Sequence, residues 1–304
     1  MPDQIGFIGL GIMGRPMALN LVKAGYGLNL YARQIDTLTP LKNFGAQIRT
    51  SCTEVAANST IIITMLKDAA AVEEVLFGPA GVVAGAQTGT VIIDMSTIEP
   101  AKAREFAQKL AEKNIDMLDA PVSGGQQGAI DGTLSIMIGG KIPVFRRMKP
   151  LLQMLGSTHY IGAQGAGQIA KACNQSLVTQ TMVAVAETLL LAKAAGVDPT
   201  VVRAALLDGS AASKILEAHG ERMINGNFAP GFKASLHAKD MGILKNLCAE
   251  LNIALPGTQG AAQWVVDLAQ QSGELDSSAV LSMMEKRMGL KLSDGQDKNK
   301  HRVR

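Results

Sequence analysis

Hydrophobic positions in the first half of the chain alternate between two spacings. Short apolar runs typical of strands cover residues 5–8, 28–31, 60–66 and 91–94, and helices are expected after residue 14 and over 52–58, 100–113 and 143–154. The β-branched run 60–66 is typical of a parallel strand that is buried on both faces. Alternating strands and helices of this kind predict an α/β fold with a doubly wound parallel sheet.

The second half of the chain has helical spacing only. Beyond residue 165 we expect helices over 199–208, 211–220, 237–251, 259–271 and 278–288. We therefore predict two domains, an α/β domain over residues 1–163 and an all-α domain over residues 164–304. The longest apolar stretch, residues 177–195, contains Glu187 and Lys193. Because charges are costly in lipid, we expect a buried helix there and no membrane span.

Three glycines end the first apolar run. Gly9 permits a tight turn, Gly11 leaves backbone N–H groups open to phosphates, and Gly14 lets the following helix pack closely on the sheet. The positive end of that helix faces the anion. The stretch predicts a dinucleotide site made by Gly9, Leu10, Gly11, Ile12, Met13 and Gly14. The same glycine spacing recurs at residues 162–167, where it runs from a loop into a helix and is interpreted as a chance match.

The residues after the second strand bear on the choice between NAD and NADP. An acidic residue there would bind the ribose hydroxyls of NAD, but the chain has Ala32 and Arg33. Arginine suits a 2′-phosphate, so NADP is expected in preference to NAD. Alternatively, Arg33 is a solvated loop residue, or it stacks on the adenine without sensing the phosphate.

Further ligand-binding groups follow later strands. Thr97 comes just after the strand at 91–94, at the strand end where doubly wound sheets bind ligands. Ser123, Gly124 and Gly125 offer a hydroxyl and two unobstructed backbone amides, which suit a small carboxylate or hydroxyl group. The alternative for this Ser-Gly-Gly is a flexible turn.

The first helix of the second half carries a polar stripe. Its members are Gln168, Lys171, Asn174 and Gln175, which fall near one face of an otherwise apolar helix. Such a stripe is a candidate active-site face. The alternative is that Lys171 pairs with a carboxylate or extends to water, as most helical lysines do.

Composition narrows the class of partner. Aromatic residues at 4% provide no stacking platform for single-stranded nucleic acid, and the net charge of +3 is small. The three cysteines, Cys52, Cys173 and Cys248, have unrelated spacings, so they indicate neither a disulfide framework nor a metal cluster. We expect a cytoplasmic protein with a small-molecule ligand and no metal, membrane or nucleic-acid partner.

The motifs together resemble one enzyme family. FIGLGIMGRPM at 7–17, DAPVSGG at 119–125, GAG at 165–167 leading to Lys171 and Asn174, and Lys239-Asp240 resemble the β-hydroxyacid dehydrogenases. The resemblance covers residues 5 to about 288. It implies an N-terminal Rossmann domain, a helical C-terminal domain that contributes to a dimer or tetramer interface, and an active site between the two.

The resemblance also implies roles for individual residues. Family members oxidise or form a β-hydroxy acid with a nicotinamide cofactor and without a metal. By this match Lys171 is the catalytic lysine, which donates the proton when hydride reaches the carbonyl carbon. The remaining matches are substrate binding by Ser123, Gly124, Gly125, Asn174 and Gln175, and cofactor binding by Met65, Leu66, Thr97 and Lys239.

Two details are similar to one subgroup, the tartronate semialdehyde reductases. They are Asn174-Gln175, where hydroxyisobutyrate dehydrogenases usually have two asparagines, and Leu236-His237 ahead of Lys239. The chain departs from the family at Lys67, where proline is common, and at Ala32, where Asp or Asn is common. The expected reaction is reduction of tartronate semialdehyde to D-glycerate. Alternatives are a 3-hydroxyisobutyrate dehydrogenase, a succinic or glyoxylic semialdehyde reductase, and a non-catalytic nucleotide sensor on the same fold.

Overall fold

The computed structural model describes residues 4–32 and 38–292. Its contacts divide the chain into two compact units, the N-terminal unit Met1–Asn174 and the C-terminal unit Gln175–Arg304. This division falls inside helix α8 (Ala166–Ala194), whereas the sequence suggested a boundary after residue 163. The difference arises because the first turns of α8 are hydrogen-bonded to the sheet, through N–H groups that donate to Asp119.

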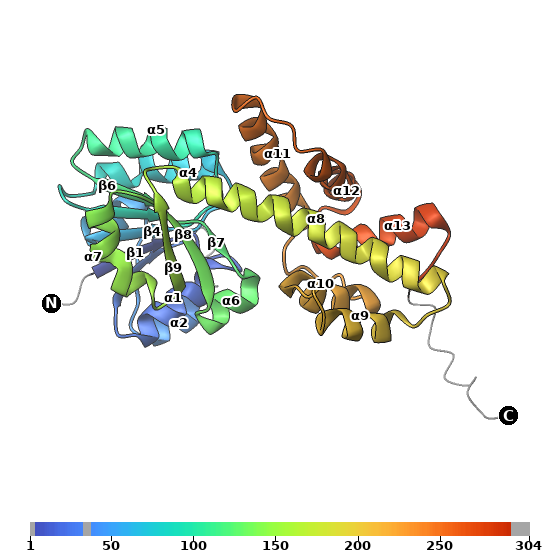
Figure 1. Ribbon diagram of the computed structural model, residues 1–304. Coiled ribbons are helices and arrows are strands. Elements are labelled where there is room, and N and C mark those ends of the chain that lie inside the picture. Colours follow the sequence, from blue (N-terminus) through green and yellow to red (C-terminus); the bar gives the residue numbers. More distant parts are fainter. Residues whose placement is uncertain (1–3, 33–37, 293–304) are drawn as a thin grey trace. The chain divides into compact units, whose positions relative to one another are not determined.

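The N-terminal unit is built on a mixed sheet whose described strands run in the order β3-β2-β1-β4-β5-β6-β8-β7, with β9 paired to β8 (Figure 1). Neighbours from β3 to β6 are parallel, and β8 is antiparallel to both β6 and β7. The strands are β1 (Gln4–Ile8), β2 (Gly27–Tyr31), β3 (Gln47–Ile48), β4 (Ile61–Thr64), β5 (Val91–Asp94), β6 (Asp116–Asp119), β7 (Val122–Ser123), β8 (Leu134–Gly140) and β9 (Gly156–Gly162). The predicted doubly wound α/β class is confirmed.

Helices lie between these strands. They are α1 (Gly14–Lys23), α2 (Thr39–Asn43), α3 (Cys52–Ala57), α4 (Ala69–Phe77), α5 (Pro100–Ala111), α6 (Gly125–Asp131), α7 (Ile142–Leu152) and the 3-10 helix η2 (Val82–Ala84). The hydrophobic pattern did not predict α4 and α6. Asp68 starts α4 by accepting a hydrogen bond from the backbone N–H of Ala71, a local cap that spacing does not reveal. Helix α6 is rich in Gly and Gln and has little apolar periodicity.

Apolar side chains cover both faces of the sheet. Along β4, Ile61 and Ile63 join one buried cluster, with Phe7 and Leu30, and the intervening Ile62 joins another. This alternation is the side-chain period of two expected for a strand. The continuous isoleucine run is therefore buried on both faces, as its sequence predicted.

In the described part of the C-terminal unit the regular secondary structure is helical, apart from one isolated bridge between Lys233 and Asp276. After α8 come α9 (Pro199–Leu207), α10 (Lys214–Ile224), α11 (Ala234–Glu250), α12 (Pro256–Ser272), η3 (Ser277–Ala279) and α13 (Val280–Met288). Its core includes Leu189, Leu216, Val265 and Met284. The predicted all-α region is confirmed, with shifts of a few residues at the helix ends.

Helix α8 belongs in part to each unit. By length and composition alone it could cross a membrane, and 44% of its most apolar window is buried within the protein. Core helices of folded domains meet the same criteria. Its apolar residue Leu189 packs in the C-terminal core, and its polar residues Gln168, Lys171 and Gln175 are buried. The helix is therefore a packing element that also carries polar groups.

Candidate functional site

The three glycines between β1 and the start of α1 have different surroundings. Gly9 has φ of +97°, and a Cβ there would lie 2.2 Å from the carbonyl oxygen of Met65. A Cβ on Gly14 would lie 2.0 Å from the carbonyl oxygen of Gly9, whereas a Cβ on Gly11 would meet no heavy atom within 4 Å. Gly9 and Gly14 are thus required by close packing, and Gly11 faces open space. This cradle fits a dinucleotide pyrophosphate.

The helix that follows is suited to an anion. Its N-cap residue, Met13, makes no side-chain cap, and its first turn contains no acidic residue. Its first N–H groups and the positive end of its dipole are therefore directed toward a ligand. β1 lies between β2 and β4, so this helix starts where the strand order reverses, the position at which doubly wound sheets bind nucleotides.

The next strand ends are tied to one another. The N–H of Met65 donates to Ile8 O at 3.0 Å, and the N–H of Leu66 donates to Ser96 Oγ at 2.9 Å. These bonds hold the segments after β1, β4 and β5 together at one edge of the sheet. Arg33, the predicted NADP determinant, lies outside the described residues.

The loop that carries Thr97 is bound to α8. Gln168 Nε2 donates to Ser96 O at 2.8 Å, and Gln168 Oε1 accepts from the N–H of Ile98 at 3.2 Å. The Gln168 side chain is buried. Thr97, which is half-buried, therefore lies between two residues, Ser96 and Ile98, whose backbone groups are both hydrogen-bonded to the Gln168 side chain.

A buried carboxylate anchors the start of α8. Asp119, at the end of β6, accepts from the N–H groups of Gly165 at 2.7 Å and Gln168 at 3.0 Å, and from Gln164 Nε2 at 3.0 Å. Burial raises the pKa of Asp119 to about 6, and the N–H donors oppose that rise. The Asp119 carboxylate, which belongs to a strand distant in sequence, thus caps the N-terminus of α8 in the way that a local N-cap side chain usually does.

Glycines at the start of α8 allow this helix to approach the sheet closely. A Cβ on Gly167 would lie 2.4 Å from Met137 O and 2.6 Å from Asp119 O. Gly165 has φ of +87°. The glycines at 162–167 were interpreted as a chance match to the dinucleotide pattern. Here Gly165 and Gly167 allow α8 to pack against β6 and β8, so they have a structural task of their own.

Ser123 is hydrogen-bonded to a residue of α8 that lies one turn beyond Lys171. Ser123 Oγ donates to Asn174 Oδ1 at 3.2 Å, and Asn174 lies one helical turn beyond Lys171. Lys171 is only 8% exposed. Gly124 and Gly125 have φ of +136° and +62°, conformations that turn the chain sharply after Ser123. Three predicted site residues are thus gathered within the N-terminal unit.

Two further predicted site residues, Gln175 and Lys239, belong to the C-terminal unit. Gln175 Nε2 donates to Asp240 Oδ2 at 2.7 Å, and Lys239 Nζ lies 3.0 Å from Asp240 Oδ1. Nearby, Thr179 Oγ1 and His237 Nε2 are 2.7 Å apart. Asp240 therefore joins Gln175 on α8 to Lys239 on α11. The sequence indicated Asp240 only as part of the Lys239-Asp240 motif and did not predict its hydrogen bond to Gln175.

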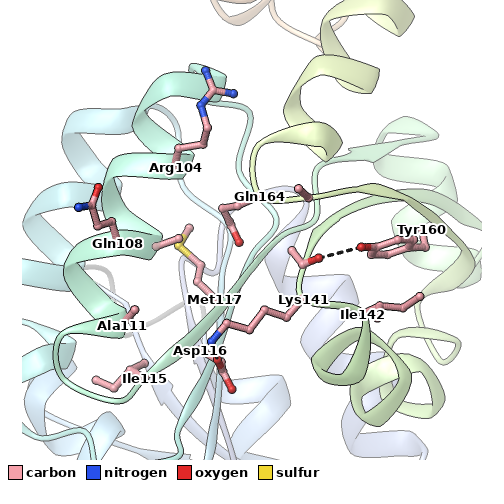
Figure 2. Close-up of a pocket in the computed structure, with 13 residues that line it drawn as sticks. Arg104, Gln108, Ala111, Ile115, Asp116, Met117, Lys141, Ile142, Tyr160 and Gln164 are labelled. Carbon is pink, nitrogen blue, oxygen red and sulfur yellow. Dashed lines mark hydrogen bonds and ion pairs between the residues drawn. The ribbon is translucent and has the colours of Figure 1, made fainter.

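The structure also contains a cavity of about 440 Å³ that none of the predicted site residues lines (Figure 2). Its lining includes Arg104, Lys141, Tyr160 and Gln164. Tyr160 donates to Gly140 O at 3.0 Å, and Lys141 pairs with Asp116 at 2.8 Å. Three of its polar side chains, Asp116, Lys141 and Tyr160, are thus engaged with other groups of the lining. Among the described residues, no group of three His, Cys, Asp or Glu side chains could hold a metal ion.

Models of known families match nearly all of the chain. Residues 4–165 match the NAD binding domain of 6-phosphogluconate dehydrogenase. Residues 165–284 match the model described as NAD-binding of NADP-dependent 3-hydroxyisobutyrate dehydrogenase. The two matches meet at the start of α8.

Individual relatives are similar over their whole length. The chain is 44% identical to 2-hydroxy-3-oxopropionate reductase of Escherichia coli (strain K12), over 93% of this chain and 97% of the relative. It is 40% identical to 2-(hydroxymethyl)glutarate dehydrogenase of Eubacterium barkeri, over 96% and 98%. The solved 3-hydroxyisobutyrate dehydrogenase of Mycobacterium tuberculosis, with L-serine, superimposes with a TM-score of 0.84 at 31% identity, over 93% and 99%. The protein therefore belongs to the NAD(P)-dependent β-hydroxyacid dehydrogenase family.

Proposed function

We propose that this enzyme reduces tartronate semialdehyde to D-glycerate, with NADPH preferred to NADH. The observation that carries the proposal is a buried lysine, Lys171, one helical turn from an asparagine that is hydrogen-bonded to Ser123. The identity of 44% to 2-hydroxy-3-oxopropionate reductase and the resemblance of the Asn174-Gln175 pair to the tartronate semialdehyde reductases support this substrate. The preference for NADPH rests on Arg33 in the sequence.

In this proposal the residues of the N-terminal unit divide the work. When bound, the reduced nicotinamide supplies a hydride to the carbonyl carbon. Lys171 holds the proton that the carbonyl oxygen gains, and its positive charge stabilises the negative charge that develops there. Because Lys171 is buried, little water competes for it, so this electrostatic interaction is stronger than at the surface.

Substrate and cofactor contacts complete the proposal. Ser123 and the backbone of Gly124 and Gly125 bind the substrate carboxylate, and Asn174 orients the lysine or the reacting hydroxyl. Gln175 is proposed as a further substrate contact and Lys239 as a cofactor contact. The glycine loop, with Leu10, Ile12 and Met13, binds the pyrophosphate. The remaining proposed cofactor contacts are Met65, Leu66 and Thr97, of which Thr97 touches the nicotinamide side.

We further propose a homodimer or homotetramer in the cytoplasm. Exposed leucines on the C-terminal part of α8, Leu177 at 67% and Leu191 at 70%, support association. Light scattering coupled to gel filtration would measure the mass in solution. A monomer at micromolar concentration would contradict this proposal.

Initial rates test the substrate directly. Tartronate semialdehyde, succinic semialdehyde and glyoxylate would be compared as acceptors, and 3-hydroxyisobutyrate as a donor, each with both cofactors. We expect the highest kcat/KM for tartronate semialdehyde with NADPH. A higher value for another compound would reassign the substrate, and no turnover of any of them would favour a nucleotide sensor.

A further inference from the structure

We infer that Gln168 is a positioning residue, which sets the Thr97 loop against the helix face that carries Lys171. The inference rests on the proposed function, because it concerns the alignment of the nicotinamide contact with the proton donor. Gln168 is not itself proposed to touch substrate or cofactor.

The Gln168 amide binds the loop on both sides of Thr97. It donates to Ser96 O at 2.8 Å and accepts from the N–H of Ile98 at 3.2 Å. These two bonds fix the orientation of the amide, because the flipped amide would oppose N–H to N–H and O to O. The backbone before and after Thr97 is thus held by one side chain.

Gln168 is itself held in place. Its backbone N–H donates to the buried carboxylate of Asp119 at 3.0 Å, and its side chain is 1% exposed. Lys171 follows three residues later on the same helix, so the two side chains project from neighbouring positions of one face. A displacement of the loop relative to Gln168 is therefore also a displacement relative to Lys171.

The loop has one further tie that extends the alignment to β4. Ser96 Oγ accepts from the N–H of Leu66, and the N–H of Ser96 lies 3.2 Å from Asp94 Oδ1. Ser96 and Leu66 are held by the sheet, whereas the two hydrogen bonds of the Gln168 side chain join this loop to α8. Replacing Gln168 should therefore loosen the loop from α8 while the sheet stays intact.

The decisive variant is Gln168→Met, which keeps the length of the side chain and removes both hydrogen bonds. A misplacement of about 1 Å can lower a rate by about 100-fold. We expect kcat to fall by roughly 10- to 100-fold, while KM for the semialdehyde and Kd for NADPH each change by less than about threefold. Gln180→Met is the matched control, since Gln180 lies on the same helix and bonds to Thr258 instead. It should keep the wild-type kcat.

Two readouts do not depend on turnover. In the cofactor-free protein, the Ile98 amide should exchange slowly with solvent, and its exchange should become faster in Gln168→Met by about tenfold or more. The fluorescence of bound NADPH should also change in Gln168→Met, because the loop beside the nicotinamide has moved. Gln180→Met should alter neither signal.

The outcomes separate the two proposals. If the wild type reduces none of the semialdehydes, the proposed function fails, and Ile98 exchange with NADPH fluorescence still decides the role of Gln168. If Gln168→Met has faster Ile98 exchange but the wild-type kcat and NADPH fluorescence, the positioning role is wrong. If Gln168→Met does not fold, Gln168→Ala takes its place, because its smaller side chain admits water to both backbone groups. Fast Ile98 exchange in the wild type overturns the inference without any variant.

Discussion

The two units hold their buried carboxylates in different ways. In the N-terminal unit Asp119 is held by two backbone N–H groups and one amide, with no cation among these donors. In the C-terminal unit Asp276 also accepts backbone N–H groups, but His219 and Arg222 lie 3.6 Å from it. Both side chains are about 1% exposed or less. Comparable burial therefore does not imply comparable electrostatics.

The pKa values of the two groups move in opposite directions. Burial raises the pKa of Asp119 to about 6, and the nearby Asp94 carboxylate adds to the rise. Burial also acts to raise the pKa of Asp276, but the nearby His219 and the hydrogen bonds from Ser278 and the backbone outweigh it and leave the pKa well below its ordinary range. The charged form is thus costly at Asp119 and favoured at Asp276. One carboxylate secures a helix beside the proposed lysine, and the other fastens a loop in the helical unit.

The largest expected effect belongs to the N-terminal unit. Lys171→Ala should lower kcat by about 10³-fold, because general acid catalysis and charge stabilisation are both lost. Binding of NADPH, measured by fluorescence titration, should stay within about threefold of wild type. Lys245→Ala, at an exposed lysine on α11, is the control and should leave kcat unchanged. Near-normal turnover of Lys171→Ala would remove this lysine from the mechanism.

The second effect tests the charged anchor. Asp276→Asn should destabilise the C-terminal unit by about 3 kcal/mol, since one NH₂ group would face N–H donors and the Arg222 guanidinium would lose its charged partner. Chemical denaturation followed by circular dichroism would measure the change. Asp267→Asn, whose carboxylate accepts a hydrogen bond from Gln263 on the same helix, should shift stability by less than about 0.5 kcal/mol. Equal losses of stability in the two variants would show that the buried carboxylate of Asp276 stabilises the unit no more than a surface carboxylate does.

The third prediction uses pH to separate the two units. The contribution of Asp119 is fully present below its ordinary pKa of 3.8 and is lost as pH rises through about 6, because its pKa is raised in the folded protein. The contribution of Asp276 has the opposite sign, being present above 3.8 and lost on acidification. Asp119→Asn should therefore flatten stability between pH 4 and 6, by roughly 1–2 kcal/mol.

Stability curves of wild type, Asp119→Asn and Asp276→Asn across pH 3 to 7 would check both signs. Asp276→Asn should instead flatten the acid limb below about pH 4. If Asp119→Asn leaves the slope between pH 4 and 6 unchanged, its carboxyl does not titrate in that window and the contrast between the two anchors fails.

The smallest effect is expected in the glycine loop. Gly11→Ala should preserve the fold, because its Cβ meets open space, but it should weaken NADPH binding by about tenfold, since the methyl group occupies the proposed phosphate position. Gly242→Ala, on an exposed part of α11 with equally open surroundings, is the control and should leave binding unchanged. Unaltered affinity in Gly11→Ala would place the pyrophosphate elsewhere.

Features that depend on local sequence could be predicted well. The tasks of Gly9, Gly11 and Gly14 follow from backbone conformation and close approach, which glycine spacing records directly. Helical periodicity likewise predicted that the members of the polar stripe share one helix, and three of them, Gln168, Lys171 and Gln175, are buried on α8. The sheet order from β1 to β6 follows from alternating strands and helices.

Features that depend on pairing between distant segments could not be predicted. Asp119 meets the start of α8 across more than 40 residues, and Gln168 reaches the Thr97 loop across about 70. Neither contact leaves a periodic signal, so the sequence indicated Gln168 only as one member of a polar stripe. Asp240 was likewise quoted without a task, because its bond to Gln175 depends on how α8 and α11 pack.

The bonds between Asp119 and α8 have a consequence for protein engineering. Two of the three donors are peptide N–H groups, which every amino acid except proline supplies. Side-chain changes further along α8, at positions 174 and 175, therefore leave those donors untouched. A combinatorial library at these two positions should therefore yield variants that accept new acid substrates while the hydrogen bonds between Asp119 and the start of α8 are kept.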